Sequence, residues 1–270
     1  MQSTEAVSCS CYFENQHVQH THPAMLAVEK AVLGSDFGGT SWTTREQADK
    51  IPLLLGLDPS SHLLEIGAGT GWPGVYLAGR TAGKITLLDL PVNSLKHARQ
   101  RAVDERLDNR CRAVAASGTA LPFVDGAFAA ISHSDVLCCL PEKLAMLNEC
   151  RRVAREGARM LFYVIRPSLG LSAPDLEEAC RVGPPFVGLS DDYPGLLHGS
   201  AWHPEEITDL TGEYLSALLR LVKLLESGST DLENVLGYIE FKDQLQHRHA
   251  QISAIRRGLL VREMYLVKAV

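Results

Sequence analysis

The fold is decided by the stretch Leu63-Leu-Glu-Ile-Gly-Ala-Gly-Thr-Gly-Trp-Pro-Gly-Val-Tyr-Leu-Ala-Gly79. It begins as an apolar strand, crosses glycines at alternate positions (Gly67, Gly69 and Gly71) and continues behind Pro73 with the spacing of a helix. Glycine tolerates positive φ and lets a ligand lie against the backbone. A proline in the first turn of a helix gives up only an N–H that has no partner there. This order predicts the nucleotide-binding turn of an open α/β sheet.

Strands and helices alternate on both sides of this turn. Apolar runs predict further strands at 84–89, 112–116, 127–135, 159–165 and 259–268, and helical spacing predicts helices at 24–34, 45–55, 93–107 and 142–153. Near-continuous apolar strands separated by helices are typical of a parallel sheet that is buried on both faces. We therefore expect an α/β fold with a mostly parallel sheet and helices on both faces.

The regular alternation of predicted strands and helices ends after residue 165. Residues 166–200 are rich in proline and glycine, 202–209 fit either a short strand or a helix start, and two helices are expected at about 211–226 and 231–257. We interpret 166–258 as a helical cap inserted before the last strand, over the ligand-binding edge of the sheet. The predicted domain covers 24–270, with its core at about 36–165 and 259–268, and 1–23 is expected to be a flexible arm.

Composition narrows the classes of function. The chain has 270 residues, is 46% hydrophobic and 21% charged, and carries a formal net charge of −6, which is an ordinary globular profile without a basic surface for nucleic acid or anionic lipid. No apolar run approaches the roughly 20 residues that span a bilayer. The N-terminus lacks a basic region followed by an apolar one, and most of the seven cysteines lie in apolar runs. We expect a reduced, cytoplasmic protein with neither nucleic-acid nor membrane partners.

The N-terminal stretch contains Cys9, Cys11, His17, His20 and His22. These residue types ligate zinc, but the spacing matches none of the common structural zinc sites. No metal site is predicted.

Two nucleotide-binding templates fit the glycine turn. Gly69-x-Gly71-x-x-Gly74 satisfies the dinucleotide fingerprint, which is weak evidence on its own. The second template requires an acid before the glycines and an acid at the end of the next strand, and Glu65 and Asp89 occupy those positions.

Further motifs follow in order. They are Ile85–Leu90, then Leu121-Pro-Phe-Val-Asp-Gly-Ala-Phe, then Cys150-Arg-Arg-Val-Ala-Arg-Glu-Gly-Ala-Arg-Met. Together with the glycine turn, they resemble the class I S-adenosylmethionine-dependent methyltransferases over about residues 36–165. The resemblance is closest to the small-molecule branch that includes ubiquinone/menaquinone-biosynthesis and glycine/sarcosine-type enzymes. It implies a Rossmann-like, seven-stranded sheet and S-adenosylmethionine as the cofactor, with S-adenosylhomocysteine as product.

The resemblance also implies roles for particular residues. Asp89 would accept hydrogen bonds from both ribose hydroxyls, Glu65 would order the glycine turn, and Leu90 and Ser117 would flank the adenine. The full set of implied cofactor-binding residues is Glu65, Gly67, Ala68, Gly69, Gly71, Asp89, Leu90, Ser117, Gly118 and His133. Ser117 stands where the family often has Asp, so this chain lacks the charge-assisted bond to the adenine.

Methyl transfer from a sulfonium needs a base only when the nucleophile must lose a proton. His133 and Asp135 are candidate bases at the end of the fourth predicted strand. A ligand loop is predicted around Trp42, Thr43 and Arg45, and an acceptor pocket for a small molecule around Tyr193, His198 and Trp202. Asp191, Asp192, Glu205 and Glu206 would favour a cationic amine, although a solvated loop and a helix start also explain them.

Two competing functions stay open. The first is an NAD(P)-binding Rossmann oxidoreductase, for which Tyr238-x-x-x-Lys242 has a suitable spacing but lies in a late helix, beyond the predicted sheet core. The second is a non-catalytic nucleotide-binding or regulatory protein. The acids on either side of the glycine turn favour the methyltransferase, acting on an O, N or C nucleophile of a small acceptor.

Overall fold

The computed structural model describes residues 16–17, 19–188 and 193–270. Most of the predicted flexible arm therefore lies outside the described residues. In the part that is described, α2 (Pro23–Leu33) is the first of the long helices and begins at the end of that arm.

One seven-stranded sheet runs through the molecule in the order β3-β2-β1-β4-β5-β7-β6. The strands are β1 (His62–Ile66), β2 (Lys84–Asp89), β3 (Cys111–Ala115), β4 (Phe128–Ser134), β5 (Ala154–Pro167), β6 (Trp202–Asp209) and β7 (Leu260–Ala269). The first five strands pair in parallel, whereas β7 is antiparallel to both β5 and β6. The prediction of a mostly parallel α/β sheet is confirmed.

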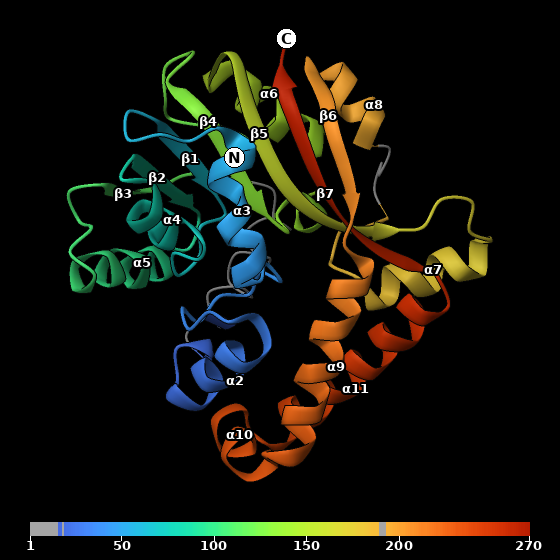
Figure 1. The fold of residues 1–270 in the computed structure, drawn as a ribbon. Helices are drawn as coiled ribbons and strands as arrows, with labels where there is room; N and C mark the ends of the chain where they lie inside the picture. The colour runs from blue at the N-terminus through green and yellow to red at the C-terminus, as the bar shows by residue number, and fades with distance from the viewer. Residues whose placement is uncertain (1–15, 18, 189–192) are drawn as a thin grey trace.

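Helices cover both faces of the sheet (Figure 1). On one face, α3 (Arg45–Leu55), α4 (Gly74–Thr81) and α5 (Val92–Asp104) share a hydrophobic cluster with β1 and β2. On the other face, α6 (Lys143–Val153) and α8 (Tyr193–Gly199) pack against β4 and β5. Every central strand is thus apolar on both sides, which explains its continuous run of hydrophobic residues.

The cap before the last strand contains α7 (Ala173–Val182), α9 (Thr211–Ser227), α10 (Ser229–Leu236) and α11 (Tyr238–Arg256). It extends away from the sheet, and its far end packs against α2 (Figure 1). Among the described residues, none of the helices combines the length and apolar character needed to cross a membrane.

The structure corrects three details of the predicted cap. Residues 202–209 are a strand, β6, which settles the open alternative. The helix expected at 231–257 is interrupted by Gly237, whose φ of 84° is incompatible with a continuous right-handed helix. The proline- and glycine-rich segment contains α7 and α8, and Ser172 caps the N-terminus of α7 by accepting a hydrogen bond from the Asp175 N–H.

Candidate cofactor and acceptor site

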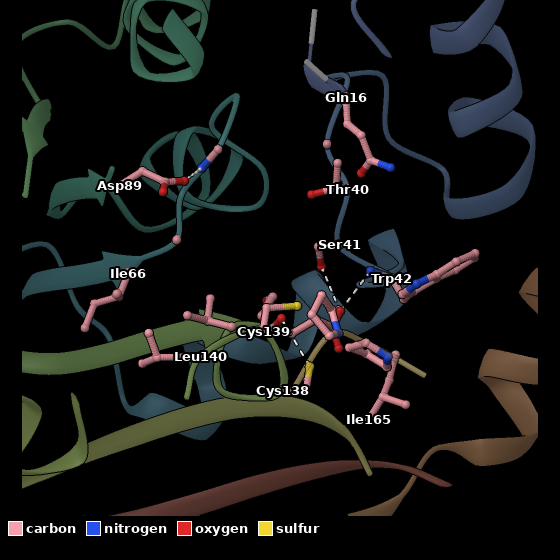
Figure 2. A pocket seen from close by; sticks show the side chains of 18 of the residues that line it. Gln16, Thr40, Ser41, Trp42, Ile66, Asp89, Cys138, Cys139, Leu140 and Ile165 are labelled. Carbon is pink, nitrogen blue, oxygen red and sulfur yellow. Dashed lines mark hydrogen bonds between the residues drawn. The ribbon is translucent and has the colours of Figure 1, made fainter. Parts of the chain in front are cut away.

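A cavity of about 450 Å³ opens at the carboxyl ends of β1, β2, β4 and β5. This volume lies in the range of small-molecule sites. Ligands of open α/β sheets bind outside the carboxyl ends of the strands. Figure 2 shows residues that line the cavity, with Asp89 on one side and Cys138 and Ile165 on the other in this view.

Asp89 ends β2 and faces the cavity. One carboxylate oxygen, Oδ2, accepts a hydrogen bond from the Gly69 N–H at 2.7 Å, and Oδ1 accepts one from the Leu90 N–H at 2.7 Å. Burial raises the pKa of Asp89 to about 6, so the group is mostly ionised at pH 7. Each carboxylate oxygen has more than one acceptor site. The geometry therefore fits a ligand that offers two hydroxyl donors.

The glycine turn brings the backbone close to the cavity. Gly67 and Gly69 have φ values of 69° and 50°. A Cβ at Gly67 would lie 2.3 Å from the Val136 side chain, and one at Gly69 would lie 3.0 Å from the His17 imidazole. Glycine is therefore required at both positions by the positive φ and by the neighbouring Val136 and His17 side chains, and the bare backbone of the turn lines the cavity beside Asp89, where a nucleoside such as that of S-adenosylmethionine would fit.

His17 lies directly over the glycine turn, a position that the sequence does not indicate. Its Nδ1 is 2.7 Å from Ser94 Oγ at the start of α5, and its Nε2 is 3.3 Å from Thr40 Oγ1. Burial lowers its pKa to about 4, so the imidazole is neutral at pH 7. Gln16 and His17 both line the cavity. Gly69 and His17 are 52 residues apart, so no local spacing in the sequence could connect them.

Glu65 lies beneath the turn instead of in the cavity wall. It is 2% exposed, and its carboxylate contacts the start of α4, with a backbone hydrogen bond from Gly74. Burial, followed by the charge of Asp89, raises the pKa of Glu65 to about 8. Glu65 is thus placed to fix the first turn of α4 as a mostly protonated acid at pH 7.

Gly74 leaves just enough room for Glu65, which makes it a sensitive position. A Cβ at Gly74 would lie 1.8 Å from Glu65 Oε2 and 2.4 Å from Leu87. We expect Gly74→Ala to reduce the free energy of unfolding by about 1–3 kcal/mol, as overpacking of a buried site does. Urea unfolding would measure it.

Gly79 provides the matched control in the same helix. It is exposed, and a Cβ there would meet only Leu107 at 3.6 Å, an ordinary contact. Gly79→Ala should stabilise the protein by about 0.5–1 kcal/mol through helix propensity. Equal effects of the two substitutions would contradict the packing of Glu65 against Gly74.

Leu90, Ser117 and Gly118 line the cavity beyond Asp89, together with Ala68 in the glycine turn. The Ser117 hydroxyl is 2.8 Å from the Thr119 hydroxyl and accepts a hydrogen bond from the Thr119 N–H. A Cβ at Gly118 would be only 3.2 Å from Ile66. Leu90 and Ser117, which the resemblance assigns to the adenine, therefore line the same cavity as Asp89, and their contact with the adenine stays a prediction.

His133 is not among the residues that line the cavity, although its neighbours Ser134 and Asp135 are. Its ring is fully buried and stacks on Phe162, with 4.8 Å between the ring centroids. Neither ring nitrogen has a hydrogen-bond partner among the described residues. Burial lowers the pKa of His133 to about 3. The structure therefore gives no support to cofactor binding or base catalysis by this residue.

Asp135 lines the cavity but is held by four donors. Its Oδ1 accepts a hydrogen bond from Arg262 Nε at 3.1 Å, and its Oδ2 accepts bonds from Arg262 Nη2, the Ser41 hydroxyl and the Trp42 N–H. The Arg262 guanidinium is fully buried and also contacts Thr43 and Gln47. Asp135 thereby fastens the loop at 40–43 to the end of β4.

The other predicted site residues lie outside the cavity wall. Arg45 covers the Tyr76 ring, the Trp202 indole donates a hydrogen bond to the Leu147 carbonyl, and His198 is exposed on α8. The complete set outside the wall is Glu65, Gly71, Thr43, Arg45, His133, Tyr193, His198 and Trp202. Asp191 and Asp192 lie outside the described residues.

The comparison with protein families favours the methyltransferase template over the dinucleotide fingerprint. Residues 64–162 match the model of the methyltransferase domain family. This part of the chain is therefore similar to a methyltransferase domain, as the sequence motifs predict. The matched segment runs from β1 to β5 and contains the glycine turn, Asp89 and Asp135.

The chain is also similar to curated methyltransferases. The chain is 26% identical to 27-O-demethylrifamycin SV methyltransferase of Amycolatopsis mediterranei, over 62% of this chain and 63% of the relative. It is 35% identical to demethylmenaquinone methyltransferase of Mycobacterium sp., over 40% of this chain and 43% of the relative. The chain thus spans less than two thirds of the length of these relatives.

The structural comparison supports the fold. A putative sarcosine dimethylglycine methyltransferase from Galdieria sulphuraria superposes with a TM-score of 0.75 at 16% identity, covering 83% of each chain. The Rossmann-like methyltransferase fold predicted from the sequence is confirmed.

Proposed function

We propose that this protein transfers the methyl group of S-adenosylmethionine to an O, N or C nucleophile of a small organic molecule. The observation that carries the proposal is the wall of the cavity, where the Asp89 carboxylate and the Gly67–Gly69 backbone meet. The match of residues 64–162 to the methyltransferase domain family supports S-adenosylmethionine as the molecule held there.

The chain's contribution to the chemistry is positioning. When bound, the donor supplies a methyl group on a positively charged sulfur, which makes its carbon electrophilic. Asp89 and the glycine turn would hold the donor, and the loop at 40–42, fastened by Asp135, would close the cavity beside it. Orientation and exclusion of water can supply most of the catalysis of such a displacement.

Neither candidate base is well placed to take a proton. His133 is buried outside the cavity, and the carboxylate of Asp135 is already engaged by Arg262, Ser41 and the Trp42 N–H. This arrangement favours an acceptor whose nucleophile attacks without help from these two residues, because a base is required only when the proton must leave before or during attack.

The oxidoreductase alternative gains no support. Tyr238 and Lys242 lie on α11 and do not line the cavity, and Tyr238 is 65% exposed. The net charge of −6 further supports a protein without nucleic-acid partners, and we propose a cytoplasmic location.

The proposal is tested by transfer of a labelled methyl group. The protein is incubated with methyl-deuterated S-adenosylmethionine and a panel of small hydroxyl, amine and activated-carbon nucleophiles, and products are analysed by mass spectrometry. We expect one product class to gain the label, with an equal amount of S-adenosylhomocysteine. Binding of the donor without label transfer to any compound would favour the non-catalytic alternative.

A further inference from the structure

The cavity extends beyond Asp89 into a region under α7, α9 and α11, which we call the acceptor half. Its walls are largely apolar and come from Trp42, Cys138, Cys139, Ile165 and Tyr214. Trp42 and Tyr214 pack edge to face, with 5.0 Å between their ring centroids. These walls suit the apolar body of a small molecule.

Basic side chains gather at the α7 and α11 side of this half. They are Arg181 at the end of α7, and His247 and Arg248 on α11. The Arg248 guanidinium lies over the Trp42 ring, 5.3 Å from its centroid. Arg181 is exposed at the edge of the cavity. Burial lowers the pKa of His247, and the charges of Arg248 and Arg181 lower it further.

Gln251 makes two side-chain hydrogen bonds, one of which links α11 to α7. Its amide nitrogen donates to the Val182 carbonyl at 2.9 Å, and its amide oxygen accepts from Arg248 Nη1 at 2.8 Å. Gln251 is 4% exposed, so the connection is internal. Because Val182 follows Arg181 in the chain, this bridge connects the segments that carry the two arginines. Both arginines line the cavity, and both charges act on the His247 imidazole.

The carboxylates of the described cavity wall have other partners. Among the described residues that line the cavity, Asp89 and Asp135 are the carboxylates. Asp89 lies at the glycine turn, and Asp135 is engaged by Arg262. Glu205, which the sequence offered for a cationic amine, lies outside the cavity wall and pairs with Arg159 at 2.7 Å.

Tyr214 adds a polar group to the apolar walls. It is 2% exposed, and its hydroxyl has no hydrogen-bond partner among the described residues. A buried hydroxyl without a partner costs free energy. A polar atom of a bound acceptor would satisfy it.

We propose that the methyl acceptor is an organic anion whose carboxylate or phosphate is bound by Arg181 and Arg248, with its apolar body against Trp42, Cys138 and Ile165. Guanidinium groups bind both kinds of anion through paired, charge-assisted hydrogen bonds. This inference rests on the proposed function, since it names the substrate class of the same cavity.

Calorimetry on the S-adenosylhomocysteine complex tests the charge preference. The probes share a phenyl group and differ in charge: phenylacetate, phenyl phosphate, the neutral phenylacetamide and the cationic phenethylamine. We expect at least one of the two anions to bind at least tenfold more tightly than the amide does, and at least tenfold more tightly than the amine does. The ratio between phenylacetate and phenyl phosphate identifies which anionic group the site prefers.

Variants connect that preference to the two arginines. Arg181→Gln and Arg248→Gln should each weaken anion binding about tenfold while the affinity for S-adenosylhomocysteine changes less than twofold. Arg256→Gln removes an exposed charge from the same helix outside the cavity wall and should change neither affinity. Because Arg181 is exposed, its variant should fold even if the Arg248 variant does not.

Two results would overturn the proposal. One is tighter binding of the amine than of either anion, or equal binding of all probes. Absence of binding by every probe counts as the same result. The other is an anion preference that persists in the Arg181→Gln variant and in any Arg248→Gln variant that folds. Failure of the proposed function would appear separately, as a lack of binding of S-adenosylhomocysteine to the unmodified protein.

Discussion

Asp89→Ala should weaken binding of S-adenosylhomocysteine about 100-fold. The substitution removes both acceptors offered to the ribose hydroxyls, and hydrogen bonds to a charged group contribute roughly 1.5–3 kcal/mol each. A loss of about 3 kcal/mol corresponds to roughly two orders of magnitude in affinity. Isothermal titration calorimetry measures this directly, and circular dichroism confirms that the variant is folded.

A matched control separates this effect from a general loss of negative charge. Asp108→Ala removes an exposed carboxylate in the turn after α5, outside the cavity wall. Its affinity for S-adenosylhomocysteine should match that of the unmodified protein. Equal affinities for all three proteins would exclude Asp89 from the ribose site.

The same carboxyl group predicts a pH dependence. Burial raises the pKa of Asp89 from 3.8 to about 6 in the free protein. Hydroxyl donors bind the ionised form better, so ligand binding should be strong above pH 6 and weaken as the pH falls through that value. Between pH 7.5 and pH 5, we expect about a tenfold loss of affinity. Asp89→Ala should bind equally weakly at both values, whereas a similar loss in that variant would assign the dependence to another group.

Arg262→Met should reduce the free energy of unfolding by about 3–5 kcal/mol. Arg262 is fully buried and Asp135 is 10% exposed, and removing one partner leaves the other charge buried without compensation. The guanidinium also lies 4.9 Å from the centre of the Tyr163 ring, a contact that methionine does not reproduce in charge. Urea unfolding at pH 7 gives the value.

A double variant distinguishes the buried charge from a cavity effect. Adding Asp135→Asn to Arg262→Met removes the unpaired charge, so the double variant should recover part of the lost stability. Arg257→Met breaks ion pairs with Asp175 and Glu178 at the surface, where Arg257 is 47% exposed, and should change the free energy of unfolding far less than Arg262→Met does. Equal losses in the free energy of unfolding for the Arg262 and Arg257 variants would show that the buried Arg262–Asp135 pair does not stabilise the fold more than a surface ion pair does.

The sequence predicted those parts of the fold and site that depend on neighbouring residues. The glycine turn, its helix start and the acid at the end of β2 all lie between residues 62 and 89. The apolar strand runs and the spacing of the glycines in this segment can be recognised from the sequence alone. Gly237 and Ser172 also carried local signals, a helix break and an N-cap, that refine the boundaries of the cap.

The remaining site features depend on contacts between distant parts of the chain. Arg262 is unusual as a charged residue in the apolar run of β7, but its partner Asp135 is 127 residues earlier, directly after β4. His17 likewise reaches the cavity through Ser94, 77 residues later. His133 shows the reverse case, because its position in an apolar strand places its ring in the core and not at the edge of the sheet.

The central claim is that the cavity at Asp89 binds the methyl donor. Calorimetric titration of the unmodified protein with S-adenosylmethionine, S-adenosylhomocysteine and NAD tests it most directly. We predict saturable one-to-one binding of the two sulfur compounds and no measurable binding of NAD. Tight binding of NAD with no binding of either sulfur compound would contradict the account.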